Sequence, residues 1–152
     1  MTSFSWTLPS TASAPVSGSS DPIDSQLGRF FGTDIYFRND YSITAQGDFL
    51  LIDGIANLRE AIYRRLLTRP GEYKFVPEYG VGISSFVKRK ASGEVLDELE
   101  TAIREQLLRE ERIESVERIA IEPTESGLNI SLIVRASGRA LRFRPFSFTE
   151  EQ

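Results

Sequence analysis

Two carboxylates beside a proline–glycine corner are the residues best suited to acid–base chemistry. Glu72 directly follows Pro70-Gly71, and Glu78 lies a few residues further on. Glycoside hydrolysis uses such a pair at separations of about 5 to 9 Å, one carboxyl acting as the acid and the other as base or nucleophile. Nothing in the sequence shows that these two converge. Glu72 has the simpler alternative of pairing with a cation or with backbone amides of the turn. A cell-wall hydrolase is therefore the catalytic alternative, and no catalytic residue is assigned.

Other catalytic chemistries are excluded by the residue types. The chain has no cysteine and no histidine. It therefore has no disulfide, thiolate ligand, cysteine nucleophile or Ser-His-Asp triad, and it lacks the ligands of most zinc and haem sites. No glycine-rich phosphate-binding loop is present either. The sequence predicts a protein that is not an enzyme and that has no cofactor and no metal site.

The charge balance argues against a nucleic-acid partner. The formal net charge is -4 and the pI is about 5.0, whereas phosphate binding favours a basic surface. Basic residues nevertheless cluster at residues 64–65, 88–90 and 139–144. No apolar run approaches the roughly 18 residues of a membrane span, and the N-terminus lacks a signal-peptide pattern. A soluble protein without a membrane partner is predicted.

The N-terminal segment differs in composition from the rest of the chain. Residues 1–28 are rich in serine and threonine, contain three prolines and carry little charge. Such a segment buries too little apolar surface to offset the entropy of ordering, so a flexible segment is predicted before one domain at residues 29–148. Trp6 lies in a short alternating apolar stretch within it. Two interpretations remain open: a disordered terminus, or a segment that becomes ordered on a neighbouring subunit.

An amphipathic helix must position the corner that carries the two glutamates. Asp53 is placed to cap this helix, and Pro70-Gly71 ends it. Residues 72–76 alternate aromatic and charged side chains and predict a short strand, and residues 77–82 predict a second turn. The apolar face repeats at helical spacing and comprises Ile55, Leu58, Ile62 and Leu66.

A second helix is predicted from Ser92, whose side chain is placed to cap it. Its apolar face comprises Val95, Leu96, Leu99, Ala102, Ile103, Gln106 and Leu107. The remaining pattern predicts strands at 30–37, 48–52, 113–122, 128–135 and 139–144, with a helical turn at 83–87. Pro145 is expected to end the last strand. The predicted fold class is α+β, with two helices packed on a mixed or antiparallel sheet that ends in a three-stranded meander.

Several short motifs carry a family resemblance. They are Phe31-Gly32-Thr33-Asp34-Ile35, Asn57-Leu58-Arg59, Ala61-Ile62, Arg65-Leu66-Leu67-Thr68, Pro70-Gly71-Glu72 and Pro77 with Tyr79-Gly80. In this order they resemble the sheath-initiator, or baseplate wedge, family of contractile injection machines. That family includes a small baseplate protein of contractile phage tails and its counterpart in type VI secretion. The resemblance spans about residues 30 to 145.

The resemblance implies a structural role. Such a protein links the baseplate to the sheath, templates sheath polymerisation by strand addition, and is present in six copies per baseplate ring. The implied partners are sheath subunits, baseplate wedge proteins and inner-tube or hub proteins. The implied location is a virion tail baseplate or an equivalent machine, with synthesis in the bacterial cytoplasm. A tail adaptor or completion protein is the other structural alternative, and the type of machine stays open.

Residues 139–144 form the predicted sheath-binding edge. A strand near the chain end is often the edge of a sheet, and its arginines discourage indiscriminate pairing. It is therefore either a solvated edge or a docking edge, where a partner adds a strand and the arginines meet carboxylates. In the family that the sequence resembles, the initiator offers a sheet to extended sheath arms, which favours docking. The residues assigned to this edge are Arg139, Leu141, Arg142, Phe143 and Arg144.

A second candidate contact follows the helical turn at 83–87. Many relatives in the family carry a Glu-Pro or Glu-Pro-Arg element here that is thought to contact the wedge core, whereas this chain has Lys88-Arg89-Lys90. The departure leaves the detail of wedge contact open. Phe86, Lys88 and Arg89 are assigned to the wedge side, and a basic loop between helices is the alternative.

Overall fold

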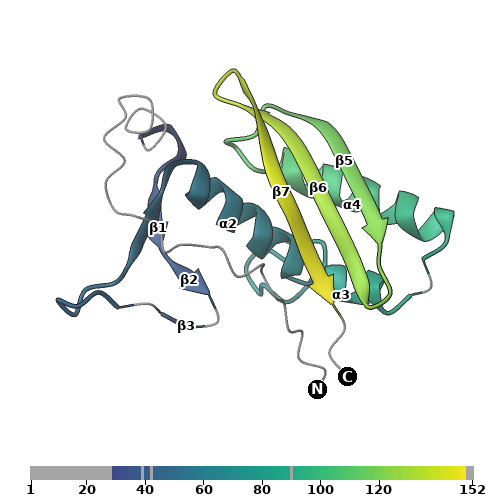
Figure 1. Ribbon diagram of the computed structural model, residues 1–152, viewed down its shortest axis with the longest axis horizontal. Helices are drawn as coiled ribbons and strands as arrows, with labels where there is room; N and C mark the ends of the chain where they lie inside the picture. Colours follow the sequence, from purple (N-terminus) through teal and green to yellow (C-terminus); the bar gives the residue numbers. More distant parts are fainter. Residues whose placement is uncertain (1–28, 39, 42, 90, 150–152) are drawn as a thin grey trace. The chain divides into compact units, whose positions relative to one another are not determined.

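The computed structural model describes residues 29–38, 40–41, 43–89 and 91–149, which form two compact units (Figure 1). Of the described residues, those up to Ala61 belong to one unit and those from Ile62 onward to the other. The division falls inside helix α2 (Gly54–Leu67), and each unit is described by itself. The N-terminal segment 1–28, with Trp6, lies outside the described residues, so its flexibility and the predicted domain at 29–148 stay predictions.

The smaller unit contains two short antiparallel strand pairs. β1 (Thr33–Ile35) pairs with β4 (Leu51–Asp53), and β2 (Phe37–Arg38) pairs with β3 (Asp40–Tyr41). The two strands predicted here are therefore present but shorter, and residues 29–31 are helical rather than extended. The backbone changes direction after that helical turn at Gly32, which has a φ of 72° that favours glycine.

Asn57 connects two of the motifs that carry the family resemblance. Its side chain is buried in α2, and its Nδ2 donates hydrogen bonds to the carbonyl oxygens of Phe31 at 2.9 Å and Gly32 at 3.2 Å. Phe31 and Leu58 are fully buried in this unit. A buried amide that satisfies two carbonyls holds the Phe31-Gly32 turn against the start of the helix.

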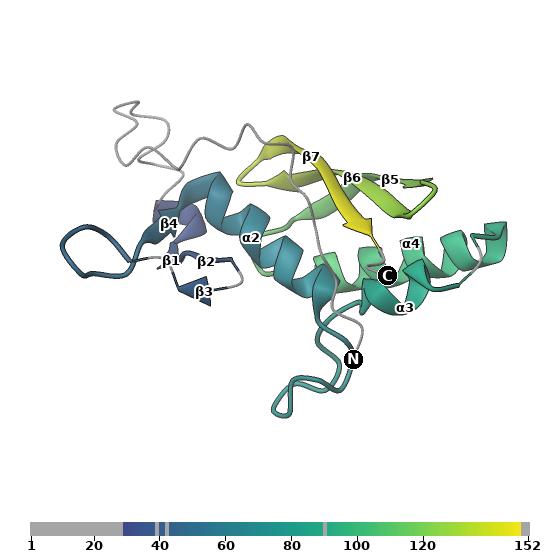
Figure 2. The same cartoon turned by 60° about the horizontal axis from the view of Figure 1, so that its bottom comes forward.

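The larger unit is a three-stranded antiparallel sheet with helices on one face. The strand order is β5 (Ser115–Pro123), β6 (Gly127–Ala136) and β7 (Arg139–Thr149). α3 (Ile83–Val87) contacts β7, and α4 (Gly93–Leu108) contacts β5. Figure 2 shows both helices on the same side of the sheet. The α+β class and the three-stranded meander predicted from the sequence are confirmed.

Helix α4 buries the face that its sequence predicts. Ser92 occupies the N-cap position with an extended backbone, but its side chain makes no capping hydrogen bond. The predicted side-chain cap is therefore wrong, although the helix starts where expected. The fully buried apolar side chains of the unit that come from helices are Ile62, Leu66, Ile83, Leu99, Ile103 and Leu107.

The last strand does not end at Pro145, contrary to the sequence prediction. β7 continues to Thr149, and its register against β6 shifts between Phe143 and Phe146. This β-bulge places Arg144 and Pro145 opposite one residue of β6, where proline is tolerated. The extra residue also returns Phe146 and Phe148 to the face that holds Phe143, and all three are buried.

Residues 72–76 are not a strand, which corrects a second prediction. Backbone hydrogen bonds fold this segment into successive turns, including Val76 N–H to Tyr73 O at 3.1 Å and Gly71 N–H to Pro77 O at 2.6 Å. Side-chain alternation produces a strand only where a neighbouring strand accepts the ladder, and here the segment bonds to itself instead.

Candidate docking surfaces

Strand β7 is an edge of the sheet. Among the strands that the structure describes, it pairs only with β6, which places it at the end of the order β5-β6-β7. Leu141 and Phe143 face the helices, with Phe143 buried, whereas the remaining predicted edge residues are exposed. The structure therefore divides the predicted set: Leu141 and Phe143 anchor the strand, and Arg142 and Arg144 are exposed on its outward side. Arg139 is exposed at the start of the strand, on the same side as Leu141.

The sheet face opposite the helices carries a row of cross-strand partners. Arg118 on β5 is opposite Ile133 on β6, and Ile133 is opposite Arg142 on β7. Both arginines are exposed and the isoleucine is half-buried. Arg118 is not among the residues predicted from the sequence, because a single arginine in a strand gives no signal until the strand order is known.

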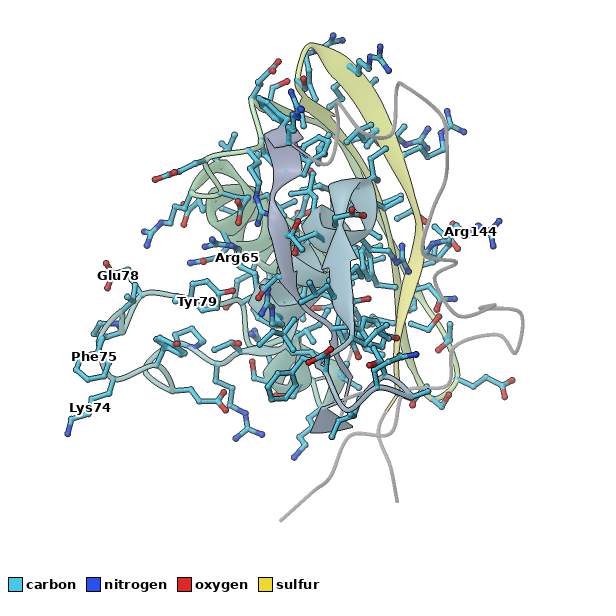
Figure 3. All side chains as sticks on the ribbon, turned by 90° about the vertical axis from the view of Figure 1, so that its left-hand side faces the viewer. Arg65, Lys74, Phe75, Glu78, Tyr79 and Arg144 are labelled. Carbon is cyan, nitrogen blue, oxygen red and sulfur yellow. The ribbon has the colours of Figure 1, made fainter. Side chains whose placement is uncertain are left out.

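An open concavity of about 410 Å³ lies on this face. Its lining includes the row just described and Arg144, and Glu122 lies at one end. Figure 3 shows the Arg144 side chain pointing outward from β7. The concavity is thus a cationic surface with apolar residues at its base. Such a surface suits the binding of carboxylates, whereas a small-molecule ligand usually binds in an enclosed pocket.

The predicted wedge-side residues lie at and just beyond the end of α3. Phe86 is only 8% exposed, so it supports this segment from the core. Lys88 and Arg89 are exposed, and the Arg89 guanidinium lies 2.8 Å from a Glu98 carboxylate oxygen and 5.5 Å from the Phe86 ring centre. A partner at this segment would therefore meet Lys88 and Arg89, with Arg89 already held in place.

The turns after α2 form a projecting loop, residues 68–82, which we call the corner loop. Figure 3 shows Lys74 and Phe75 at its tip and Tyr79 closer to Arg65 at its base. Phe75 is 88% exposed, and Tyr73 and Val76 are exposed too. An ordered loop that presents aromatic side chains to solvent is typical of a protein–protein contact.

Gln106 fixes the base of the corner loop. Its Oε1 accepts a hydrogen bond from the Gly80 amide at 3.0 Å, and its Nε2 donates to the Glu78 carbonyl at 2.7 Å. Gly80 has a φ of 103°, and a Cβ there would overlap the Thr68 carbonyl oxygen. Gln106, which the sequence predicted on the apolar face of α4, is thus buried as expected, but its side chain binds the backbone of the corner loop.

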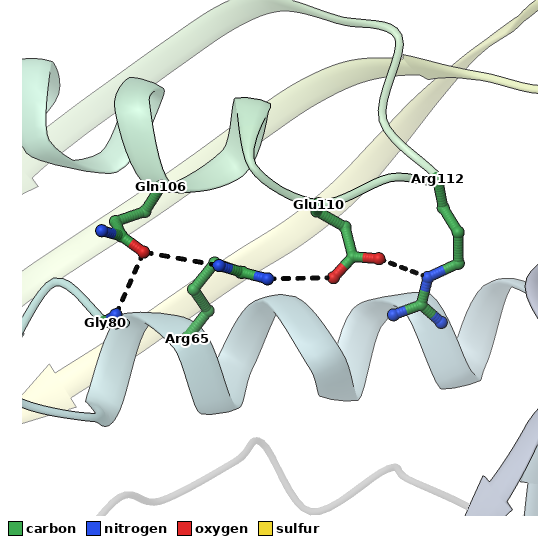
Figure 4. A network of polar contacts seen from close by, with 5 residues as sticks. All are labelled: Arg65, Gly80, Gln106, Glu110 and Arg112. Atoms are coloured by element: carbon green, nitrogen blue, oxygen red, sulfur yellow. Dashed lines mark hydrogen bonds and ion pairs between the residues drawn. The ribbon is translucent and has the colours of Figure 1, made fainter. Parts of the chain in front are cut away.

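Arg65 extends this network, which Figure 4 shows in close view. Its guanidinium lies 3.4 Å from Gln106 Oε1, 3.3 Å from Glu110 Oε2 and 4.5 Å from the centre of the Tyr79 ring. Arg112 binds the other Glu110 oxygen at 2.6 Å. Burial raises the pKa of Glu110, but the hydrogen bonds and charges of Arg112 and Arg65 outweigh burial and leave that pKa below its ordinary value.

The surroundings of Glu72 and Glu78, the two glutamates of the hydrolase alternative, give no sign of a catalytic site. Glu72 Oε2 accepts a hydrogen bond from the Arg69 amide at 2.9 Å, which is the turn-stabilising role that the sequence suggested. The side chain of Glu78 is exposed. A pocket of about 370 Å³ beside the corner loop is lined by neither glutamate; its lining residues are Arg64, Thr68, Tyr73, Val76 and Tyr79. The geometry therefore gives the hydrolase alternative no support.

The described residues contain no cluster of three or more side chains that would suit a metal ion. Within the same residues, none of the helices combines the length and the apolar character that a membrane span requires.

Comparisons with known proteins place the chain in a family. The model of the contractile injection system sheath initiator family matches residues 33–137, which is more than half of the chain. The chain therefore belongs to the contractile injection system sheath initiator family. This confirms the resemblance carried by residues 31–35 and 57–80, and it makes the chain a structural component of that class of machine. No significant match was found among curated proteins.

One solved structure has a similar fold. It is a chain of the anti-feeding prophage (AFP) baseplate, determined by cryo-EM with 6-fold symmetrisation. The two chains are 22% identical, the match covers 74% of this chain and 90% of that chain, and the TM-score is 0.63. At this identity the likeness supports the fold.

Proposed function

We propose that this protein is a non-enzymatic baseplate component of a contractile tail or related injection machine, and that it links the baseplate to the sheath. It templates sheath polymerisation at β7, where an extended arm of a sheath subunit adds a strand. The observation that carries this proposal is the position of β7 at the end of the strand order β5-β6-β7, in a member of the sheath initiator family. Main-chain hydrogen bonds along such an edge provide affinity without requiring a pocket.

The side chains of β7 suit such an arm. Leu141 and Phe143 fix the strand to the core, so the edge is already ordered before the arm arrives. Arg139, Arg142 and Arg144 are exposed along it and would meet carboxylates of the arm. In the free protein, these arginines also keep the edge from pairing with the same edge of another copy, because like charges directly opposite are destabilising.

The attachment of this protein to the rest of the baseplate involves the segment after α3. Lys88 and Arg89, supported by the buried Phe86, contact a baseplate wedge protein, and inner-tube or hub proteins lie nearby. The similar baseplate structure was determined with 6-fold symmetrisation, which supports six copies of this chain per ring. No nucleic acid or membrane takes part, and the protein acts in the baseplate after synthesis in the bacterial cytoplasm.

Adjacent prolines test the edge directly. Successive amide groups of a strand point to opposite sides. One of the two variants Leu141→Pro and Arg142→Pro therefore removes a hydrogen-bond donor from the outer edge of β7, and the other removes a donor from the ladder with β6. We expect the variant that keeps cooperative thermal unfolding to join baseplates but to lose sheath in electron micrographs. Normal sheath on that variant would contradict docking at β7.

The matched control uses the opposite edge of the same sheet. Ile121→Pro and Glu122→Pro form the equivalent adjacent pair on β5. We expect the member of this pair that folds to support normal sheath growth. Equal loss of sheath from both edges would indicate damage to the sheet rather than loss of a specific docking strand.

The non-enzymatic role is tested at the two corner glutamates. The double variant Glu72→Gln with Glu78→Gln should assemble tails that retain any wall-lysing activity of the wild type. Normal tails that lose lysis would favour the cell-wall hydrolase alternative instead.

A further inference from the structure

We propose that the open face of sheet β5–β7 is a second binding surface, which takes an acidic protein segment lying across the strands. This surface is distinct from the edge of β7, and its use does not require strand addition. The protein has a net charge of -4, yet Arg118, Arg142 and Arg144 line one concavity on this face. The local charge is therefore opposite to that of the whole chain.

The row Arg118–Ile133–Arg142 provides the geometry of the site. These three residues are direct cross-strand partners on β5, β6 and β7. Strands lie about 4.7–4.9 Å apart, so the Cα atoms of the two arginines are about 10 Å apart. Ile133 lies half-buried between them. The row thus offers two cations that flank an apolar contact.

The two cations of the row are not neutralised by any residue that the structure describes. Neither Arg118 nor Arg142 forms a hydrogen bond or ion pair with any residue that the structure describes. Arg135, on the same strand as Ile133, shows the contrast, because its guanidinium lies 2.6 Å from a Glu117 carboxylate oxygen. An arginine that already has such a partner gains less from a new carboxylate than one that has none. Arg118 and Arg142 are therefore available to bind an anionic partner.

The two ends of the concavity differ in charge. Ala120 and Ser131 form the next outward-facing row, and Glu122 and Asn129 the one after it. A carboxylate placed near Glu122 is repelled, whereas one placed near the arginines is attracted. The acidic residues of the partner are therefore held at the Arg118–Arg142 end.

This arrangement defines the chemistry of the partner. Guanidinium groups bind carboxylates in bidentate geometry, and Ile133 provides contact for an apolar side chain. The partner is a protein segment with two carboxylates about 10 Å apart and an apolar residue between them. The phosphate backbone of a nucleic acid also binds arginines, but the acidic chain as a whole repels it.

A labelled peptide tests the site. The repeat (Glu-Gly-Leu)₄ has glutamate at every third residue, so in the polyproline II conformation successive glutamates lie on one side about 9 Å apart; (Gln-Gly-Leu)₄ is its neutral counterpart. Fluorescence anisotropy should detect binding of the acidic peptide at low ionic strength, weakening as salt is added. Arg118→Glu should reduce this affinity by about tenfold or more. Arg118→Gln, which adds no negative charge, should cause a smaller loss.

Two controls separate the face from other effects. Arg109→Glu makes the same charge change at an exposed residue outside the concavity and should leave binding within about twofold of wild type. Arg118 lies on β5, so its substitution leaves the edge of β7 unchanged. Lost peptide binding by Arg118→Glu together with normal sheath growth would support the face site independently of the proposed edge function.

Three results would overturn the proposal. The first is equal binding by wild type and by both Arg118 variants. The second is equal binding of the neutral peptide. The third is tighter binding of a labelled single-stranded oligouridylate than of the acidic peptide, which would make the face a phosphate-binding surface.

Discussion

At the scale of single residues, the half-buried carboxylate of Glu110 and the buried amide of Gln106 hold the corner loop. Glu110 forms ion pairs with both Arg65 and Arg112, and Gln106 binds the Gly80 amide and the Glu78 carbonyl. Arg65 contacts both of these residues and the Tyr79 ring. A change at either Glu110 or Gln106 should therefore affect the loop as well as global stability.

Substitution Glu110→Gln should destabilise the protein at neutral pH by about 1–3 kcal/mol, because it leaves Arg65 and Arg112 without a counter-charge. The pKa of Glu110 is lowered in the folded protein, so its charge stabilises the fold above the ordinary carboxyl pKa of about 4.5. That contribution is lost as the pH falls through the lowered value.

Denaturant unfolding at a series of pH values measures this effect. The difference between wild type and Glu110→Gln should be largest above about pH 5 and should shrink in more acidic buffer. A difference that stays constant from neutral to acidic pH would show that the charge of Glu110 is not the stabilising feature.

Substitution Gln106→Leu should loosen the corner loop. Leucine fills the apolar site but leaves the Gly80 amide and the Glu78 carbonyl without their partner, at a cost of about 1–3 kcal/mol. Hydrogen exchange at Gly80 should accelerate more than exchange in β6. The exposed neighbour Glu105→Gln is the control, and unchanged protection of Gly80 in Gln106→Leu would refute this role.

Sequence reasoning found these residues but not their roles. Gln106 falls on the apolar face of its helix by spacing alone, and Asn57 belongs to a family motif. Their partners come from other segments: Gly80 and Phe31 lie 26 positions away from Gln106 and Asn57, respectively. Helical periodicity specifies which face a residue occupies, but it contains no information on which distant backbone atoms reach that face.

At the scale of elements, the bulge of β7 decides which side chains complete the core. Phe143 precedes the bulge, while Phe146 and Phe148 follow it, and all three are buried. Tyr63 of α2 stacks on both later rings, with ring centres 6.1 and 5.8 Å apart. Strict alternation would have turned these two phenylalanines to the open face.

Deletion of Pro145 should therefore prevent cooperative folding. Removing the extra residue shifts Phe146 and Phe148 to the other face of the sheet, and exposing a buried phenylalanine costs about 3–5 kcal/mol, within a typical total stability of about 5–15 kcal/mol. Pro145→Ala keeps the residue count and should unfold cooperatively. Near-UV circular dichroism with thermal melting distinguishes the two, and a native-like deletion variant would contradict the role of the bulge.

The elements that were predicted correctly are those with long periodic patterns. The two long helices repeat their apolar spacing over 14 and 16 residues, and β6 alternates over 10. In β5 and β7 the alternation is interrupted by a register shift, but enough of it remains on one side of the shift to predict a strand. The errors fall where local rules compete with tertiary ones. Proline was expected to end β7 but lies in a bulge, and residues 72–76 alternate like a strand but lack a neighbouring strand.

At the scale of the whole molecule, the fold separates two kinds of surface on the larger unit. The helices cover one face of the sheet, and the two proposed docking surfaces are its other face and the edge at β7. We propose that both surfaces take part in assembly of the machine to which the sheath initiator family belongs. The edge provides main-chain pairing and the face provides charge, so the two can recognise different segments.

The most direct test is sheath growth on baseplates assembled with and without this protein. The purified sheath subunit encoded alongside it is added to both preparations, and sheath is scored by electron microscopy. The proposed function predicts that sheath grows only on baseplates that contain the protein, and that adding the protein back restores growth. Sheath that grows equally well without the protein would contradict a templating role.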